Sequence, residues 1–221
     1  QGLSESLIDP ALARLAVQHA TLRLGCRVMA LGIEAGRVAA LATTEGEVAL
    51  AAGDEVVLAV PAPVAASLLP GLVVPAAFQA IVNIHYALAA PPAAPPFVGI
   101  VGGLAEWVFA KPGHVSVTIS AANRLADQPG DDLGRRAWAE VAAALGLPGQ
   151  APPRFRVVRE KRATFAATPA QEARRPGARS GLANLALAGD CTATGLPATI
   201  EGAITSGRHA AAIFLTPTPE A

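Results

Sequence analysis

The chain has 221 residues, which is enough for one large domain or two small ones. Apolar residues make up 52% and charged residues only 15%, which indicates a chain with a sizeable core rather than a disordered one. Lysine plus arginine number 17, as do aspartate plus glutamate, so no charge excess points to nucleic acid. Cys26 and Cys191 lie far apart, which argues against a disulfide framework or a cysteine metal motif and fits the reducing cytoplasm.

The N-terminal region predicts a helix followed by three short strands. Asp9 and Pro10 are typical of a helix start, with Asp9 as the N-cap and Pro10 at the first helical position. The next strand-like runs are joined by short turns that contain glycine, which is typical of a β-meander. These runs cover residues 27–33, 37–43 and 47–50.

Two continuous apolar runs predict buried strands, at residues 55–61 and 185–188. Neither run alternates between apolar and polar residues, so we expect each to be buried on both faces. We expect them to be neighbouring, or nearly neighbouring, parallel strands of one sheet. A helix over residues 63–69 follows the first run, and a helix over residues 197–214 follows the second.

The middle of the chain predicts an α+β segment dominated by antiparallel pairing. Its strand-like runs cover residues 81–88, 106–109, 114–119 and 155–161, and an amphipathic helix covers residues 132–145. Asp131 and Asp132 mark the start of that helix. The predicted fold is therefore an α/β layer, residues 1–75 and 174–221, with an inserted α+β domain of antiparallel sheet and helix, residues 76–173.

Residues 56–105 contain no charged side chain, which raises the question of a membrane span. Eight prolines interrupt the stretch, so no uninterrupted apolar helix of about 18 residues remains. We expect buried strands and a proline-rich connection, or else a lipophilic surface that touches a membrane or lines an apolar cavity. Because no charged segment with an apolar core follows Gln1, we also expect no signal peptide.

The connection between the last strand and the last helix is the strongest candidate for a binding site. Gly189 and Asp190 end the strand, and small residues lead to the helix start, where Pro197 or Ala198 suits the first turn. Backbone N–H groups at a helix start attract electron-rich ligand atoms, and a carboxylate at a strand end accepts hydrogen bonds from ligand hydroxyls. The alternative is a tight strand–helix junction in which Asp190 only caps the helix.

The same stretch resembles the C-terminal FAD-binding motif of the flavin amine oxidase and phytoene desaturase superfamily. The resemblance rests on Gly189 and Asp190, on the run TATGLPATIEGA at residues 192–203, and on the Ser206–Gly207 pair. The residues of this motif are most similar to those of the squalene-associated branch, the hydroxysqualene dehydroxylases of hopanoid biosynthesis. The runs RATFAATP (162–169), RP (175–176), GCRV (25–28) and VVLAVP (56–61) extend the resemblance over most of the chain.

The resemblance implies roles for individual residues toward FAD. Asp190 would bind the ribityl or pyrophosphate region, the backbone of Ala198, Thr199 and Ile200 would face the pyrimidine edge of the flavin, and Val28 would clasp the adenine through its backbone. The remaining motif residues implied in cofactor binding are Gly189, Gly195, Leu196 and Pro197. Residues 1–75 and 174–221 would form part of an FAD-binding, Rossmann-like domain, and residues 76–173 the substrate domain.

The chain departs from the family pattern in two ways. Cys191 stands where the branch has a large aromatic residue, and no GxGxxG motif occurs. The chain therefore resembles the C-terminal half of such an enzyme, with the N-terminal half of the same enzyme as its partner. We expect this half alone to bind FAD weakly and to be inactive.

Other chemistry is sparse. The four histidines show no metal-ligand spacing, no nucleophile elbow is present, and no residue identifies itself as catalytic. Trp107 and Phe109 could line an apolar substrate cavity or simply fill a core.

The resemblance implies an FAD-dependent oxidoreductase that converts hydroxysqualene, a lipophilic substrate, to squalene. We expect it in the cytoplasm, peripheral to the inner face of the membrane. A phytoene or carotenoid desaturase-like enzyme, an amine oxidase and a non-catalytic ligand-binding module remain alternatives.

Overall fold

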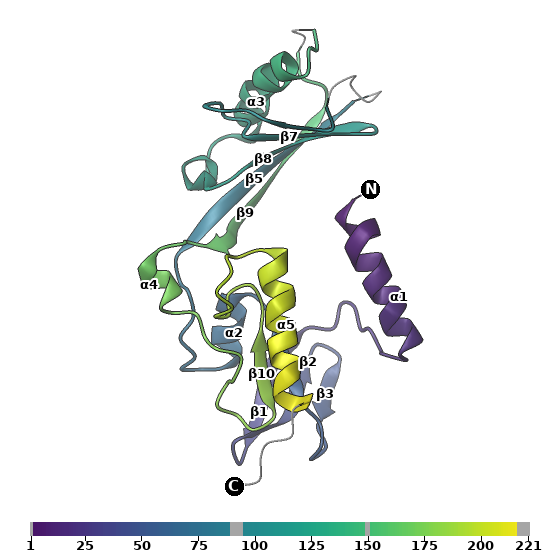
Figure 1. Cartoon of the computed structure of the whole chain (residues 1–221), viewed down its shortest axis with the longest axis vertical. Coiled ribbons are helices and arrows are strands. Elements are labelled where there is room, and N and C mark those ends of the chain that lie inside the picture. The colour runs from purple at the N-terminus through teal and green to yellow at the C-terminus, as the bar shows by residue number, and fades with distance from the viewer. Residues whose placement is uncertain (1, 89–94, 149–150, 216–221) are drawn as a thin grey trace. The chain divides into compact units, whose positions relative to one another are not determined.

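The computed structural model describes residues 2–88, 95–148 and 151–215 (Figure 1). The chain divides into two compact units. The first comprises Gln1–Val56 and Gly181–Leu185, and the second comprises Val57–Ser180 and Ala186–Ala221. The chain thus crosses from one unit to the other more than once.

The first unit begins with a helix that starts earlier than its sequence predicts. A π-helical turn, η1 (Ser4–Ile8), runs directly into α1 (Asp9–Val17). Ser6 donates hydrogen bonds to the Gly2 carbonyl from its backbone N–H, at 3.1 Å, and from its hydroxyl, at 2.9 Å. Because these bonds extend the helix backward, Asp9 lies inside helical backbone, and its prediction as an N-cap was wrong.

The predicted β-meander is confirmed. Its strands pair antiparallel in the order β1-β2-β3. They are β1 (Val28–Glu34), β2 (Arg37–Thr43) and β3 (Gly46–Ala49). Asn184 joins the returning segment to this sheet, because its buried amide accepts from the Val38 N–H at 2.8 Å and donates to the Val38 carbonyl at 3.0 Å.

The two apolar runs form β4 (Val56–Ala59) and β10 (Leu185–Ala188), which are hydrogen-bonded neighbours as predicted. β10 is buried at all four positions, whereas Val57 on β4 is 45% exposed. Burial of β4 on both faces was therefore a wrong prediction, because no described element covers the Val57 side of the strand. The helix that follows β4 is α2 (Ala62–Leu68).

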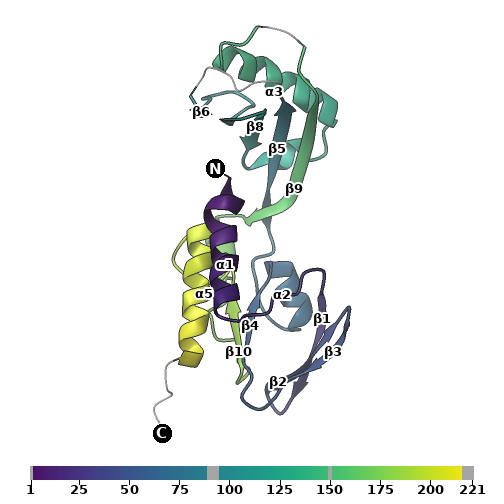
Figure 2. The same cartoon turned by 90° about the vertical axis from the view of Figure 1, so that its right-hand side faces the viewer.

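The last helix, α5 (Ile200–Leu215), lies alongside β10 (Figure 2). It packs on the strand through small side chains. Ala186 and Ala188 of β10 contact Ala210 of the helix, with Ile213 and Phe214 at the margin of the cluster. Alanines on both sides let the helix approach the strand closely, so β10 and α5 hold the segment that joins them.

The middle of the chain forms a five-stranded antiparallel sheet in the order β6-β7-β8-β5-β9. Its strands are β5 (Phe78–Ala87), β6 (Phe97–Gly99), β7 (Trp107–Lys111), β8 (His114–Ile119) and β9 (Phe155–Phe165). The predicted antiparallel pairing and the predicted helix, α3 (Gly130–Ala144), are confirmed. The sequence did not predict β6, η2 (Ala122–Leu125) or α4 (Pro169–Glu172), each of which has at most four residues.

The main core lies between this sheet and α3 (Figure 2). Alternate residues of β5, such as Val82, Ile84 and Tyr86, are fully buried against α3. Tyr86 donates its hydroxyl to the Gly134 carbonyl at 2.7 Å, and burial raises the pKa of the Tyr86 phenol. This hydrogen bond satisfies the one polar atom that Tyr86 carries into the core.

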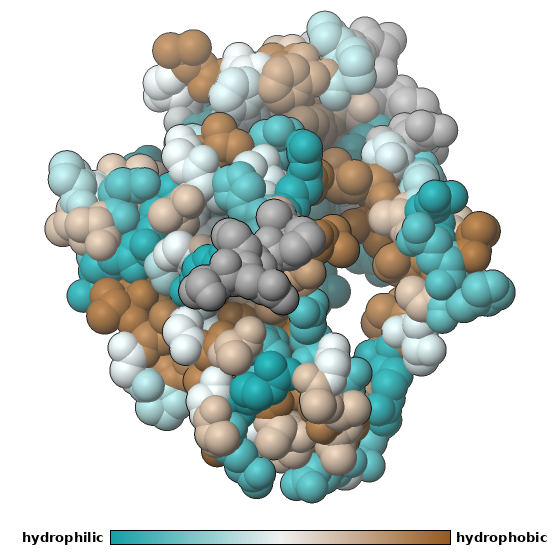
Figure 3. Space-filling view, turned by 60° about the horizontal axis from the view of Figure 1, so that its bottom comes forward, coloured by the Kyte–Doolittle hydropathy of each residue, from teal (hydrophilic) through white to brown (hydrophobic). Residues whose placement is uncertain are grey.

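No helix among the described residues is long and apolar enough to cross a membrane. The described part of residues 56–105 forms β4, α2, β5 and β6, so the prediction that this stretch is not a span holds there. Residues 89–94 of the stretch lie outside the described residues. Apolar side chains nevertheless reach the surface in places (Figure 3), including Met29, Val57 and Ile204.

Gly134 provides a test of the α3–sheet packing. A Cβ at this position would lie 1.9 Å from the Phe155 ring, so an alanine must push the helix off β9. We expect Gly134→Ala to lower the free energy of unfolding by about 1–3 kcal/mol, although alanine favours a helix by up to about 1 kcal/mol. Urea unfolding measures the change.

Gly207 is the matched control, because it lies within α5 and a Cβ there would meet no atom within 4 Å. Gly207→Ala is expected to stabilise the protein slightly. Equal stabilisation by both substitutions would show that α3 does not pack on β9 as described.

Candidate functional site

The segment between β10 and α5 begins at a glycine that the backbone requires. Gly189 has φ +128°, a conformation that side chains with a Cβ rarely adopt. Its N–H donates to the buried Ser206 hydroxyl of α5 at 2.7 Å. This hydrogen bond ties the end of β10 to α5, so both ends of the loop between them are held in place.

Thr199 caps α5. Its hydroxyl accepts from the Gly202 N–H at 3.1 Å, and the helix begins at Ile200. The prediction that Pro197 or Ala198 occupies the first turn was wrong, because this cap places both before the helix. The interpretation of Asp190 as the cap was also wrong, since its carboxylate has no hydrogen-bond partner among the described residues.

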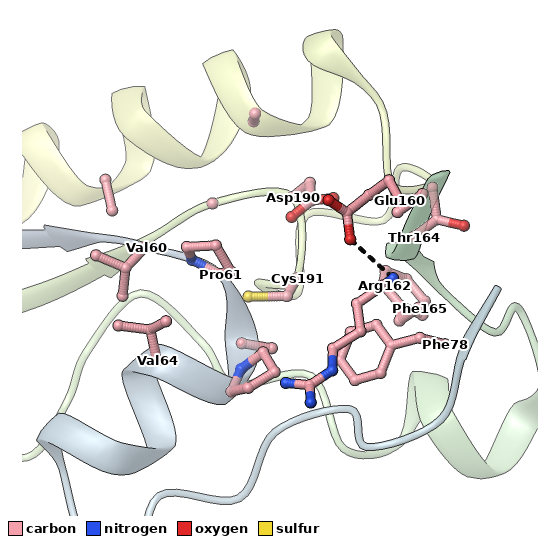
Figure 4. Close-up of a pocket in the computed structure, with 16 residues that line it drawn as sticks. Val60, Pro61, Val64, Phe78, Glu160, Arg162, Thr164, Phe165, Asp190 and Cys191 are labelled. Carbon is pink, nitrogen blue, oxygen red and sulfur yellow. Dashed lines mark hydrogen bonds between the residues drawn. The ribbon is translucent and has the colours of Figure 1, made fainter. Parts of the chain in front are cut away.

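A cavity of about 550 Å³ opens beside Gly189 and Asp190 (Figure 4). Val60, Pro61 and Val64 line it from the β4–α2 side, and Phe78 lines it from β5. Further lining residues come from β9, including Glu160, Arg162 and Thr164. Four segments that are distant in sequence thus meet at the carboxyl end of β10, the position where a ligand was predicted.

The cavity carries polar groups that are free to meet a ligand. The carboxylate of Asp190 is unpaired, and the Arg162 guanidinium has no hydrogen-bond or ion-pair partner in the described chain. Glu160 accepts from the Arg162 backbone N–H at 2.9 Å, the bond dashed in Figure 4. The cavity therefore combines an apolar wall with carboxylates and one cation.

Cys191, next to Asp190, fills space rather than supplying chemistry. Its buried side chain packs with Ala62 and Val74, in the position where the resemblance would place an aromatic ring. Burial, and next the charge of Asp190, raise the pKa of the Cys191 thiol. The thiol stays protonated near neutral pH, which argues against a nucleophile or a metal ligand here. No group of metal-ligating side chains is found among the described residues.

A second cavity, of about 420 Å³, lies along the rest of the loop. The predicted residues Gly195, Leu196, Pro197 and Ala198 line it together with Phe165 of β9. Gly195 has φ +77°, so glycine is required here as well. Gly195 and Ala198 carry almost no side chain, which leaves their backbone accessible from the cavity.

Arg175 fixes the shape of this loop. Its side chain is 2% exposed and donates to the Thr192 carbonyl, to the Asp190 carbonyl at 3.4 Å and to the Thr194 hydroxyl at 3.3 Å. Its guanidinium also forms an ion pair with Glu172 at 3.0 Å. One buried cation thus ties three positions of the loop to α4.

Arg175 also lies over an aromatic ring, with its guanidinium carbon 5.0 Å from the centre of Phe165. Its Nε has no hydrogen-bond partner among the described residues. A buried donor without a partner costs free energy, so this atom is a candidate contact for a ligand in the second cavity, which Arg175 lines.

The structure brings most of the predicted cofactor residues together. Gly189 and Asp190 line the first cavity, residues 195–198 line the second, and Thr199 and Ile200 start α5. Val28 begins β1 of the first unit and lines neither cavity. Trp107 and Phe109 lie on β7 and likewise line neither.

Sequence reasoning missed Arg162 and Arg175 as parts of the site. Both lie in runs that carry the family resemblance, but a lone arginine has no spacing that reveals its partners. The only local signal for Arg175 is Glu172, three residues earlier, which suits an ion pair on one helical turn.

Comparison with known proteins decides the family. Residues 3–91 and 103–215 match the flavin containing amine oxidoreductase family. The chain belongs to this family.

Three curated relatives that the chain matches are hydroxysqualene dehydroxylases. The protein from Rhodopseudomonas palustris is 49% identical over 97% of the chain, and that from Sinorhizobium fredii is 47% identical over 98%. These matches cover 51% and 52% of the relatives, so the chain spans about half their length.

Solved structures agree on the fold. An oxidoreductase from Methanosarcina mazei has a TM-score of 0.61 at 14% identity and matches 91% of this chain and 52% of its own. Iminodiacetate oxidase from Chelativorans sp. has a TM-score of 0.54 at 22% identity and matches 98% of this chain and 56% of its own. The chain therefore has the expected α/β plus α+β fold of such oxidoreductases.

Arg175→Lys tests how far the guanidinium holds the loop between β10 and α5. Lysine keeps the charge but cannot reach three acceptors at once, so the carbonyls of Asp190 and Thr192 lose a donor. We expect a loss of about 1.5–3 kcal/mol in unfolding free energy and faster amide exchange over residues 192–196. Urea unfolding and hydrogen exchange measure the two effects.

Arg179→Lys serves as the control, since the Arg179 side chain is exposed and has no hydrogen bond or ion pair described. It should change neither quantity. Unchanged exchange over residues 192–196 in Arg175→Lys would contradict the role given to Arg175.

Proposed function

We propose that the chain is half of an FAD-dependent oxidoreductase that acts on a long isoprenoid and converts hydroxysqualene to squalene in hopanoid biosynthesis. The observation that carries the proposal is 49% identity to a hydroxysqualene dehydroxylase over 97% of the chain. The matched region includes both the loop between β10 and α5 and the five-stranded sheet. The other part of the same enzyme is then the partner of this chain.

The two cavities fit FAD by their own chemistry. The Asp190 carboxylate has no partner within the described part of the chain, which suits hydrogen bonds from ribityl hydroxyls, while Gly189 and Gly195 keep side chains away from the backbone. The backbone of Ala198 and Thr199 leads into α5, which begins at Ile200, and the N–H groups at this helix start suit the electron-rich pyrimidine edge of the flavin. When bound, the flavin supplies the hydride chemistry, which protein side chains lack.

The remaining cofactor contacts are proposed on the resemblance alone. Leu196 and Pro197 complete the loop, and the backbone of Val28 clasps the adenine. Residues 1–75 and 174–221 then form part of the FAD-binding domain. Residues 76–173 form the substrate domain, with Trp107 and Phe109 lining the substrate, and support comes from the separate core of sheet and α3.

A lipophilic substrate suggests where the enzyme works. We propose a cytoplasmic protein that contacts the inner face of the membrane, where squalene-like molecules dissolve. Support comes from the fully exposed apolar side chain of Val101 on the substrate domain.

An amine substrate is less well supported. Amine recognition favours an aromatic cage, often built from tyrosine. The single tyrosine of the chain, Tyr86, is fully buried and bonded to Gly134. It is therefore not available to a substrate.

FAD titration of the full-length enzyme tests the cofactor site. Asp190→Ala should weaken FAD binding about 10- to 150-fold, because a charge-assisted hydrogen bond is worth roughly 1.5–3 kcal/mol. Because the Asp190 carboxylate has no partner among the described residues, its removal orphans none of their polar groups. Ala198→Trp should block the approach to the loop sterically. Flavin fluorescence follows both titrations.

Asp131→Ala is the control, because Asp131 is exposed in the first turn of α3. It should bind FAD like the wild type. Wild-type affinity in both Asp190→Ala and Ala198→Trp would mean that the loop is only a strand–helix junction.

A further inference from the structure

The five-stranded sheet has a second face that α3 does not cover. The strand register places one row of residues across all five strands on this face. In sheet order the row is Phe97, Phe109, Ser116, His85 and Arg156. Their neighbours along each strand point to the opposite face, where Tyr86 and Val115 are fully buried. We call this second face the open face.

Aromatic rings gather at one edge of the open face. Phe97 and Trp107 stack with centroids 5.2 Å apart and an interplanar angle of 8°, and Phe109 lies 5.1 Å from Phe97. Phe97 is 50% exposed and Trp107 is 42% exposed. We call these three residues the aromatic rail. Rings exposed to this extent bury much apolar area when a ligand covers them.

Hydrogen-bonding side chains lie beside the aromatic rail, in the middle of the open face. His85 Nδ1 lies 2.8 Å from the Ser116 hydroxyl, and the Thr118 hydroxyl donates to Asn83 Oδ1 at 2.7 Å. The other ring nitrogen of His85, Nε2, has no hydrogen-bond partner among the described residues. It is therefore available to a ligand.

His85 also lines a cavity of about 480 Å³ at the end of the sheet. His114, Arg154 and Arg156 line the same cavity, and no carboxylate does. Burial lowers the pKa of His85, and the nearby charges of His114, Lys111 and Arg156 lower it further. An electron-rich oxygen is favoured in such surroundings.

We propose that the open face binds an isoprenoid alcohol, with the aromatic rail along the hydrocarbon chain and the His85–Ser116 pair at the hydroxyl. The inference rests on the proposed function, because the relatives supply the substrate class. Complementarity supports it: one row of the sheet presents rings beside a hydroxyl-binding pair, which suits a ligand that carries a hydroxyl next to a hydrocarbon arm.

His85 and Ser116 would also discriminate substrate from product. A ligand that lacks the hydroxyl leaves the His85 Nε2 without a partner, and an unmade polar contact costs more than a made one contributes. The aromatic rail, in contrast, contacts hydrocarbon that both molecules share. Polar and aromatic substitutions should therefore differ in which ligand they affect.

The test compares two ligands in the full-length enzyme with oxidised flavin, where no turnover occurs. Isothermal titration measures the affinity for hydroxysqualene and for squalene in the same detergent. His85→Leu should weaken hydroxysqualene binding about 5- to 15-fold and leave squalene binding unchanged. His85→Gln keeps a hydrogen-bonding group and should restore part of the preference. Trp107→Ala should weaken both ligands alike.

His209→Leu is the matched control, because His209 is an exposed histidine of α5 far along the helix from the loop. It should leave both affinities unchanged. The proposal is overturned if wild type binds both ligands equally, or if His85→Leu affects both or neither. It is also overturned if Trp107→Ala changes the oligomeric state and neither affinity, since the open face is then an interface.

Turnover of hydroxysqualene by reduced wild-type enzyme is a separate measurement. Absence of turnover counts against the proposed function, while a hydroxyl preference that His85→Leu removes still supports the open-face site. If the enzyme turns over hydroxysqualene but His85→Leu does not alter its preference for hydroxysqualene over squalene, the proposed function is supported and the open-face site is overturned.

Discussion

The loop between β10 and α5 depends on one buried cation. Arg175 bonds two loop carbonyls and one hydroxyl, and the loop has no secondary structure of its own to hold it. At the other end, Ser206 holds the Gly189 N–H. These contacts satisfy loop carbonyls and the Gly189 N–H, whereas the Asp190 carboxylate and the backbone of residues 195–198 remain available on the cavity side. A loop held in this way has little ordering entropy left to lose when a ligand binds.

Local patterns predicted the elements of this fold well where the signal is short-range. The meander, α2, α3 and β10 follow from apolar runs and turn residues. The pairing of β4 with β10 is long-range and followed from their shared all-apolar character. The failures came from contacts that a pattern does not contain. Asp9 missed its predicted role because Gly2 and Ser6 extend the helix backward, and Pro197 missed the first turn because Thr199 supplies the cap.

The candidate site shows the same division. Gly189, Asp190 and the loop residues were predicted because their types are unusual for a strand–helix junction. Arg175 was not, because the loop groups that it bonds lie 15 or more residues away along the chain. Arg162 was not, because its importance comes from the cavity that it lines with residues distant in sequence. Burial of the Arg175 side chain is likewise a property of the folded chain, since arginine is among the residue types least often buried.

The open face likewise depends on strand register, which a local sequence pattern does not contain. Phe97 and Arg156 are far apart in sequence, and Phe97 lies on a three-residue strand that the sequence did not predict. Antiparallel pairing nevertheless places both in one row with His85, because each strand fixes the register of the next. A shift of one residue in β5 would turn His85 into the core and Tyr86 outward. The burial of Tyr86 and its hydrogen bond to Gly134 therefore hold His85 on the open face. Ligand binding by His85 thus depends on this contact in the core.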